Sequence, residues 1–434
     1  MKKVLIISPY FPPYNTADMQ RVRMSLPFYK EFGWQAEIVT IKNPDVDSPM
    51  DPMLSQTVPA DTIIHYVNAL PKKLTSKIGL GSAALRSLYF YKKKVDKLLR
   101  QGQYDLVFFS TTQFAVCTLG ALWKKKFGIP YLIDMQDPWL SDHYINLPKA
   151  QRPKKHWFSH RLNQTLEPIA MKNVGGLMSV SAAYIEVLQK RYPELHDKPA
   201  DVITFGASAV DFEIAKTNAS SLKLVYDKNT NNRNLVYVGR GGHDMRPALE
   251  ILFENFKRLL TKDFETYNRY HFYFIGTSYA AAGKGTPTVA PIAKEFGLSA
   301  HVTEQTDRIG FFESIHNLAN ADGLCIISSN SASYTASKLY PYILSKKPIL
   351  AIIHSQSSAS HILKYCHAGI GISINETDNR ALEKLVSYLT IVNEEQVPAT
   401  DWQKFEEFGA ASLTKKQCEL FNRVISAHED SNHS

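Results

Sequence analysis

Two arginines and three glycines stand together in the stretch "YVGRGGHDMRPALEIL", residues 237–252. Arg240 follows an apolar run that is typical of a strand, and Arg246 lies where a helix is expected to begin. Arginine side chains and the amides of a helix N-terminus both attract anions such as phosphate. Glycines let the backbone approach such an anion; here they are Gly239, Gly241 and Gly242. The stretch indicates a phosphate site, unless an arginine only pairs with Asp244 or Glu250.

A further cation, Lys338, occurs in "SKLYPYILSKKPILAI", residues 337–352. Ser337 is a candidate N-cap, so Lys338 would open a helix that leads into a buried strand. A lysine at a helix N-terminus opposes the macrodipole unless an anion lies nearby. Pro341 falls in the first turn, where few amides have intrahelical partners and proline is tolerated. We expect this helix start to line a nucleotide pocket; the alternative is a solvated lysine.

A carboxylate, Asp137, ends the expected strand in "IDMQDPWLSDHY", residues 133–144. Ligands of open α/β folds bind beyond the carboxyl ends of the strands. Asp137 is therefore a candidate for binding a polar ligand at this edge of the sheet, and Asp134 and Trp139 could line the same pocket. The alternative is that Asp137 only caps a helix or a turn.

The elements that must position these residues form two α/β halves. Short apolar strands such as "KKVLII", "YDLVFFS" and "PYLIDM" alternate with helices in the first half, as in a parallel sheet covered on both faces. The strand–loop–helix pattern restarts at "LVYVG" and continues through "YHFYFIG", "GLCIIS" and "PILAII". The restart predicts two doubly wound, Rossmann-like domains that face a cleft.

The expected domain boundaries follow this pattern. We assign residues 1–212 to an N-terminal acceptor-binding domain and residues 213–233, which are mostly polar, to a linker. Residues 234–400 form the expected nucleotide-binding domain. Residues 401–434 have helical apolar spacing and are expected to cross back onto the first domain.

Composition narrows the class of protein. The 434 residues include 44% hydrophobic and 21% charged residues, as in a soluble globular protein. The four cysteines form no close pair, which argues against a metal knuckle or a disulfide framework. The apolar run at the N-terminus is short and ends in prolines, so we expect a strand rather than a signal peptide. The expected compartment is the cytoplasm.

The net charge of +9 is concentrated in basic clusters before residue 162. A solvated surface is one interpretation, and attraction to the inner face of an anionic membrane is the other. The stretch "ALRSLYFYKKKVDKLLR", residues 84–100, could lie on such a membrane as an amphipathic helix, or could pack on the core with one wet side. No nucleic-acid motif accompanies the charge, so nucleic acid is not an expected partner.

Four stretches resemble the retaining glycosyltransferases of family 4 in order and spacing. They are "ISPYFPPYNTADMQRVRMSLPFYKEFGWQAEIVT", "YLIDMQDPW", "YVGRGGHDMRPALEIL" and "ASKLYPYILSKKPILAI". The resemblance covers nearly the whole chain and is strongest to enzymes that make bacterial surface polysaccharides. It implies the two-domain GT-B fold, a nucleotide-sugar donor, transfer with retention, and no metal or other cofactor.

The resemblance also assigns roles in donor binding. Arg240 and Arg246 match the basic pair that meets the donor diphosphate, and Ser337 and Lys338 match the helix start that faces the diphosphate or the ribose. No convincing DxD motif for a metal is present.

The chain departs from the family pattern at two places. Asn15 and Thr16 replace a Gly-Gly pair near the donor phosphate, and Arg21 or Arg23 in the following helix could reach the cleft. Ser333 and Pro341 stand where many members carry two glutamates, the second of which holds the ribose. Polar side chains near the first position offer weaker hydrogen bonds; they include Ser331, Tyr334 and Thr335.

The expected function is transfer of a sugar to a glycan or a polyprenol-linked acceptor in polysaccharide biosynthesis. Asp137, Arg240 and Arg246 are the expected catalytic residues. One alternative is an inactive GT-B protein that serves as a binding or scaffold subunit, which the missing glutamates favour. Another GT-B enzyme, such as a sugar-nucleotide 2-epimerase, would need converging carboxylates and histidines that the sequence does not identify.

Overall fold

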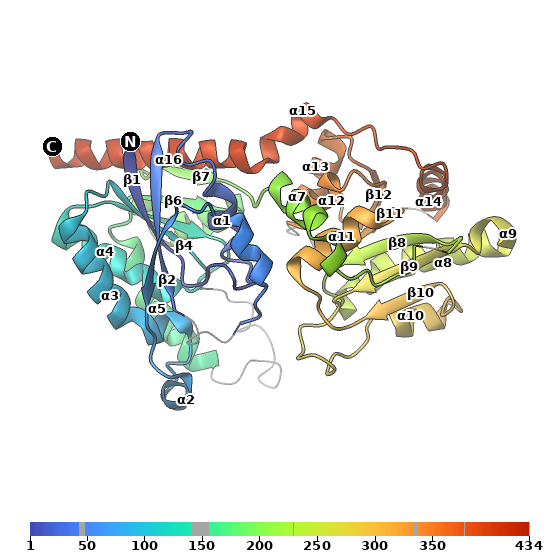
Figure 1. Ribbon diagram of the computed structural model, residues 1–434, viewed down its shortest axis with the longest axis horizontal. Helices are drawn as coiled ribbons and strands as arrows, with labels where there is room; N and C mark the ends of the chain where they lie inside the picture. The colour runs from blue at the N-terminus through green and yellow to red at the C-terminus, as the bar shows by residue number, and fades with distance from the viewer. Residues whose placement is uncertain (43–47, 141–155, 229, 333–336, 377, 434) are drawn as a thin grey trace. The chain divides into compact units, whose positions relative to one another are not determined.

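The computed structural model describes residues 1–42, 48–140, 156–228, 230–332, 337–376 and 378–433. The chain forms two compact units (Figure 1), one of Met1–Gly206 with Ala410–Ser434 and the other of Ala207–Gly409. Helix α7 (Ala209–Thr217) packs on α11 (Phe311–Asn320) and belongs to the second unit. The packing therefore divides the chain before residue 212, the expected end of the first domain.

The first unit contains a seven-stranded parallel sheet in the order β3-β2-β1-β4-β5-β6-β7. Its strands are β1 (Lys2–Ile7), β2 (Trp34–Ile41), β3 (Ile63–Val67), β4 (Leu106–Ser110), β5 (Tyr131–Met135), β6 (Gly176–Ser179) and β7 (Ala200–Val202). Its helices are α1 (Gln20–Ser25), α2 (Lys72–Thr75), α3 (Ala83–Gln101), α4 (Thr118–Phe127), α5 (His156–Met171), α6 (Ala182–Arg191) and α16 (Ala410–His433).

Alternation of side chains along β1 explains why this strand is apolar throughout. Val4 and Ile6 belong to the hydrophobic core on one face of the sheet, whereas Leu5 and Ile7 belong to the core on the other face. All four are fully buried. Helices cover both faces of the sheet. Side chains on either face of the strand are therefore shielded from water, and apolar residues suit both sets.

Helix α3 packs on the core with one wet side, one of the two interpretations of residues 84–100. Tyr91, Val95 and Leu99 are buried, and Ser82 caps the helix by accepting a hydrogen bond from the amide of Leu85. On the wet side, Lys92 pairs with the buried Asp96, which also binds Lys126.

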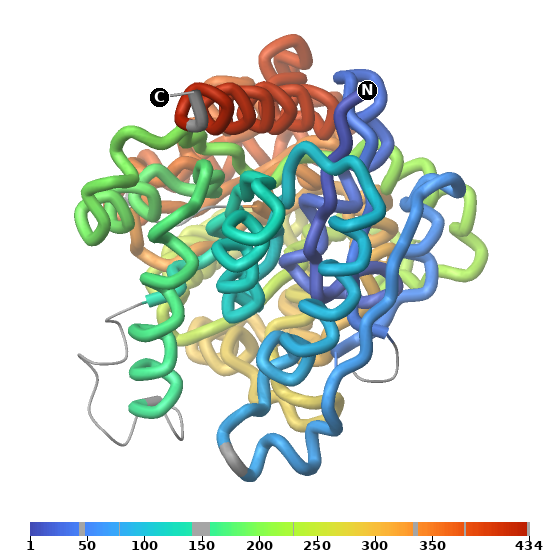
Figure 2. The backbone as a smooth tube through the Cα atoms, turned by 90° about the vertical axis from the view of Figure 1, so that its left-hand side faces the viewer, coloured from blue at the N-terminus to red at the C-terminus, as the bar shows by residue number. Residues whose placement is uncertain are grey.

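The C-terminal helix α16 belongs to the first unit, which confirms the expected return of the chain. Phe421 packs its ring 5.2 Å from that of Trp34 and 5.0 Å from that of Phe108. The N-terminus lies beside this helix in Figures 1 and 2. Lys2 donates a 2.8 Å hydrogen bond to Asn422 of the helix. Large apolar contacts of this kind fix the two ends of the chain to one core.

The second unit contains a six-stranded parallel sheet in the order β10-β9-β8-β11-β12-β13. Its strands are β8 (Arg233–Val238), β9 (Tyr270–Ile275), β10 (Val302–Gln305), β11 (Gly323–Ile327), β12 (Ile349–Ile353) and β13 (Ile370–Ser373). Besides α7 and α11, its helices are α8 (Arg246–Lys262), α9 (Phe264–Tyr267), α10 (Ala290–Glu295), α12 (Leu339–Leu344), α13 (Ser358–Tyr365), α14 (Asp378–Asn393) and α15 (Trp402–Phe405).

Helix α8 shows why the second half of the sequence folds as expected. Its buried residues recur at helical spacing, with Leu249, Leu252, Phe253 and Phe256 on the face that packs on the sheet. The two doubly wound parallel sheets confirm the predicted fold class. Within the described ranges, no helix is long and apolar enough to span a bilayer.

Candidate functional site

Lys338 lies against the backbone at the carboxyl end of β8. Its ammonium nitrogen occupies the space that a Cβ atom on Gly239 would need. It donates a 3.3 Å hydrogen bond to the hydroxyl of Tyr237 and lies 5.2 Å from the centre of that ring. A glycine is therefore required at 239 for this lysine to reach the strand end.

The charge of Lys338 is poorly compensated. Burial, together with the positive charges of Arg240 and Arg308, lowers the pKa of Lys338 to about 8. In the part of the chain that the structure describes, no carboxylate forms an ion pair with Lys338. The positive charges of Arg240 and Arg308 thus both act on Lys338, an arrangement that favours an anion.

The two arginines of the glycine-rich stretch are both paired with carboxylates. Arg240 donates two hydrogen bonds, of 3.0 Å and 2.5 Å, to the two carboxylate oxygens of Asp244. Arg246 donates to Glu250 at 2.7 Å and also pairs with Glu295. The ion-pair alternative therefore describes both arginines in this structure. Their role in donor binding stays a prediction.

The glycines at 241 and 242 allow the loop after β8 to pack closely. A Cβ on Gly241 would collide with the hydroxyl of Thr288, and one on Gly242 would collide with Asp244 and Arg240. The amide of Gly241 donates a 2.7 Å hydrogen bond to the carbonyl of Thr277, which follows β9. The loops after two neighbouring strands are thereby joined beside Lys338.

Helix α12 differs in one detail from the expectation. It begins at Leu339, and Lys338 itself occupies the N-cap position without a side-chain cap. Ser337, the expected cap, is exposed and lies one residue before the N-cap position. Pro341 lies in the first turn and the helix continues past it, as expected. Ser333 and Thr335 lie outside the described residues.

Arg308 is a candidate that sequence reasoning missed. It lies beyond the carboxyl end of β10, with its guanidinium 4.8 Å from the centre of the Tyr279 ring, and its charge reaches Lys338. The arginine beyond a strand end in "EQTDRIG" could have been noticed, because parallel strands end at the same edge of a sheet. Tyr237, which is internal to its strand, offered no such signal.

In the first unit, Asn15 and Thr16 follow β1 in a loop that pairs with residue 49. The amide of Asn15 donates a 2.8 Å hydrogen bond to the carbonyl of Pro49, and both side chains are half-buried. The hydroxyl of Thr16 lies near the buried Asp18, whose pKa is raised by burial. Thr111 also donates to Asp18, at 3.0 Å.

Asp134 does not line a pocket, contrary to expectation. It is 0% exposed and accepts a 2.6 Å hydrogen bond from Arg21, which is 2% exposed. Arg21 also donates to the carbonyls of Ile203 and Thr204, which ties the first helix to the end of the sheet. Arg23 is also buried and bonds Gln20. These arginines serve the core of the first unit.

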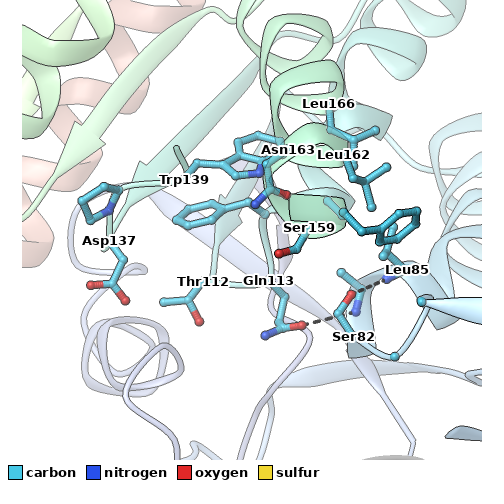
Figure 3. Close-up of a pocket in the computed structure, with 17 residues that line it drawn as sticks. Ser82, Leu85, Thr112, Gln113, Asp137, Trp139, Ser159, Leu162, Asn163 and Leu166 are labelled. Carbon is cyan, nitrogen blue, oxygen red and sulfur yellow. Dashed lines mark hydrogen bonds between the residues drawn. The ribbon is translucent and has the colours of Figure 1, made fainter. Parts of the chain in front are cut away.

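Asp137 has a different setting from Asp134, although the two residues are close in the sequence. Its side chain is exposed at the edge of a cavity, where neighbouring atoms displace water and raise the pKa of Asp137. Figure 3 shows its carboxylate pointing away from Trp139. No hydrogen bond or ion pair joins this carboxylate to another described residue. The segment that it would cap continues outside the described residues, so the capping alternative is not tested.

The segment that carries Asp137 is fixed by contacts with helix α5 and with Phe114. Glu167 on α5 is fully buried and accepts a 3.1 Å hydrogen bond from the amide of Leu140. Arg191 and Tyr192 also bind this carboxylate. Trp139 stacks on Phe114 with 5.3 Å between ring centres. Residues 136–140 after β5 are therefore held in place, and Asp137 is the exposed carboxylate among these five residues.

Among the described residues, no cluster of three or more histidine, cysteine, aspartate or glutamate side chains is placed to hold a metal ion. The four cysteines are all buried and unpaired, and burial raises the pKa of the Cys325 thiol to about 12.

No protein-family model matches the sequence. No curated protein matches it either.

Several solved structures share the fold. A glycosyltransferase from Rickettsia africae is 12% identical with a TM-score of 0.57, and the match covers 98% of each chain. A UDP-forming α,α-trehalose-phosphate synthase from Burkholderia xenovorans is 11% identical with a TM-score of 0.59, covering 98% of this chain and 99% of that one. TarM from S. aureus, solved as a mutant in complex with Fondaparinux, α-GlcNAc-glycerol and UDP, is 12% identical with a TM-score of 0.56, covering 97% and 100%. The chain therefore has the GT-B fold of these glycosyltransferases.

Proposed function

We propose that this protein is a glycosyltransferase that moves a sugar from a nucleotide-sugar donor to a hydroxyl acceptor. The observation that carries the proposal is Lys338, a cation without a carboxylate partner in the described structure, beside Gly239 at the end of β8. TarM, which has a similar fold, was solved in complex with UDP. Lys338, Arg240 and Arg308 carry positive charge beyond strand ends, so an anionic diphosphate is the ligand that would suit them best.

In the proposed reaction, the protein supplies charge and position rather than a covalent nucleophile. The bond between the sugar's anomeric carbon and the donor phosphate oxygen breaks, and a bond from that carbon to the acceptor oxygen forms on the same face. The acceptor proton passes to the leaving diphosphate. Lys338 stabilises the charge that grows on that diphosphate, because an ammonium in a partly buried site interacts strongly with it.

Arg240 and Arg308 extend this electrostatic role. Arg240 would exchange Asp244 for a phosphate oxygen when the donor binds, since its ion pair is partly exposed and holds it only weakly. Arg308 adds a third positive charge from beyond the end of β10. Arg246 binds two carboxylates and is expected to act through the helix start rather than by direct contact.

Asp137 is proposed to accept a hydrogen bond from the acceptor hydroxyl. Its exposed carboxylate lies at the carboxyl end of the first sheet, and it keeps free lone pairs in the described structure. Retention of configuration, independence of metal and a place in polysaccharide biosynthesis belong to the same proposal. They rest on the sequence resemblance.

Contact with an anionic membrane is also proposed, through a surface other than helix α3. Leu74 in α2 is 66% exposed and Trp157 in α5 is 70% exposed. Lysines surround Leu74 in the sequence; they are Lys72, Lys73 and Lys77. Exposed apolar side chains among lysines are typical of proteins that lie on an anionic bilayer.

A non-enzymatic nucleotide-binding or scaffold subunit is the second candidate. It is favoured by the carboxylate partners of Arg240 and Arg246 and by Pro341, which offers no ribose clamp. It predicts that no nucleotide binds, or that binding does not depend on the cations at the end of β8.

Isothermal titration with UDP, GDP and ADP tests the proposal. One nucleotide should bind, and Lys338→Met should weaken its binding by about tenfold or more, as expected for loss of a charged hydrogen bond. Arg240→Ala should weaken it too. Lys364→Met is the matched control, because Lys364 is exposed on α13 of the same unit. Binding of none of the three nucleotides would favour the scaffold instead.

A further inference from the structure

A cavity of about 530 Å³ opens beside Asp137 within the first unit. It lies between the start of α3, the 3-10 helix η3 (Phe114–Cys117), the loop after β5 and helix α5. Its volume is within the range of small-molecule sites, which is roughly 300–1,000 Å³. Nothing in the reaction described above uses the part of this cavity that lies beyond Asp137.

The cavity has a polar side and an apolar side. Figure 3 shows Asp137, Thr112 and Gln113 along its left and lower edges, whereas Leu162 and Leu166 gather at its upper right. The ring of Trp139, which stacks on that of Phe114, lies between the two groups in Figure 3. Ser159 and Asn163 on α5 lie between them, so a ligand would meet polar groups at one end and along its middle, and apolar side chains at the other end.

The polar side is pre-organised by the start of α3. The side-chain oxygen of Gln113 accepts a 3.5 Å hydrogen bond from the backbone amide of Ala84. The backbone amide of Gln113 donates a 2.9 Å hydrogen bond to the hydroxyl of Thr111. These bonds orient the Gln113 amide group, whose NH₂ stays available as a donor among the described residues. Carboxylate, amide and hydroxyl groups together suit the hydroxyls of a sugar.

The apolar side is incompletely covered by protein. Leu85, Leu162 and Leu166 are only half-buried, and Phe158 lies close to the backbone of Gly79 at the same wall. The free energy of the system falls when a ligand removes such apolar surface from water. No lysine, arginine or histidine is present among the described lining residues, so these residues offer a diphosphate no cation.

We propose that this cavity binds the acceptor, and that the acceptor is a glycoside with an uncharged apolar aglycone. The sugar would lie at Asp137 and Gln113, and the aglycone against Leu85, Leu162 and Leu166. This inference rests on the proposed glycosyl transfer and adds the acceptor's chemical class. It separates a neutral glycolipid-like acceptor from a free glycan and from a diphosphate-linked one.

Titration of short amphiphiles into the full-length protein tests the inference. Octyl β-D-glucoside, octyl β-D-galactoside and octyl N-acetyl-β-D-glucosaminide are compared below their critical micelle concentrations with the matching methyl glycosides and with octyl phosphate. At least one octyl glycoside should bind, with affinity rising about fourfold for each methylene that is buried. The methyl glycosides and octyl phosphate should bind far more weakly.

Variants on α5 show whether binding occurs in this cavity. Leu162→Glu places a charge on the apolar wall and should weaken octyl glycoside binding by about tenfold or more. Leu162→Trp fills the space without adding charge and should weaken it similarly. Ile169→Glu is the matched control, because Ile169 is exposed on the same helix and does not line the cavity. The control should bind as the unaltered protein does.

The outcomes separate this inference from the proposed function, because nucleotide binding is measured on the same samples. Normal UDP, GDP or ADP binding without octyl glycoside binding overturns the acceptor assignment alone. Equal weakening by Leu162→Glu and Ile169→Glu also overturns it, since detergent would then bind elsewhere. Tighter binding of octyl phosphate than of any octyl glycoside would point to an anionic acceptor and contradict the neutral class.

Discussion

The ammonium of Lys338 occupies the space that a side chain at position 239 would fill, so Gly239 and Lys338 are structurally dependent on each other. Gly239→Ala should displace the lysine and weaken nucleotide binding by about tenfold, because the displaced cation no longer faces the strand end. The fold should survive, since the end of a lysine side chain can move. Titration calorimetry and thermal melting measure the two effects. Gly371→Ala, in ordinary contact with Leu363, is the control and should bind normally.

Nucleotide binding should depend on pH through Lys338. Its pKa is lowered to about 8 in the free protein, and a bound anion would raise it again. Affinity should therefore fall as pH rises from about 7.5 through 9, while the lysine loses its proton. The same titration with Lys338→Met should show a flatter pH dependence. Equal slopes for the two proteins would contradict a role for Lys338 in binding.

Stability should change with pH in the opposite sense at the same residue. Because the pKa of Lys338 is lower in the folded protein than its ordinary value of 10.5, the unfolded chain binds more protons between the two values. The free energy of unfolding should therefore rise as pH increases from about 8 toward 10.5. Urea denaturation of the unaltered protein and of Lys338→Met measures this contribution as a difference. A contribution that falls over that range would have the wrong sign.

Pro341 is the position at which the proposed donor pocket would lack a carboxylate for the ribose. Pro341→Glu should tighten nucleotide binding if the pocket lies at the start of α12, because a carboxylate can accept both ribose hydroxyls. Pro341→Gln is the matched control, since it also removes the proline but adds no charge. Calorimetry should show a larger gain for glutamate than for glutamine. Equal gains would assign the effect to the proline.

The buried pair Arg21–Asp134 should be important for the stability of the first unit. Asp134→Ala leaves Arg21 as an uncompensated buried charge and should cost about 3–5 kcal/mol of unfolding free energy. Asp201→Ala is the control, because Asp201 pairs with Arg423 at the surface, where an ion pair contributes about 1 kcal/mol or less. Urea denaturation compares them. Similar losses for both variants would refute the structural role of the buried pair.

Membrane binding should depend on the exposed apolar residue of α2. The protein should sediment with liposomes that contain anionic lipid at low salt, and high salt should release it. Leu74→Glu should reduce the bound fraction, whereas Val397→Glu, at an exposed apolar residue of the second unit, should not. No sedimentation of the unaltered protein at low salt would remove the proposal.

Much of the fold could be predicted from local patterns in the sequence. The apolar runs of β1 and β8 require cover on both faces, and the spacing of Leu249, Leu252 and Phe256 requires a helix that packs on a sheet. Pro341 could be placed in a first helical turn because only the first amides of a helix lack intrahelical partners. Such patterns depend on local periodicity, which the sequence displays directly.

The site depended on contacts between distant parts of the chain. Asp134 and Asp137 look alike in the sequence, yet one is buried against Arg21 and the other is exposed beside a cavity. Arg308 comes near Lys338 only because β8, β9 and β10 are parallel neighbours, which brings distant loops to one edge of the sheet. The sequence by itself therefore determined the elements, the two parallel sheets and the residue types at their ends. Only the tertiary structure decided which charges are paired, which are left for a ligand, and where the cavity lies, because strand order and side-chain packing set those distances.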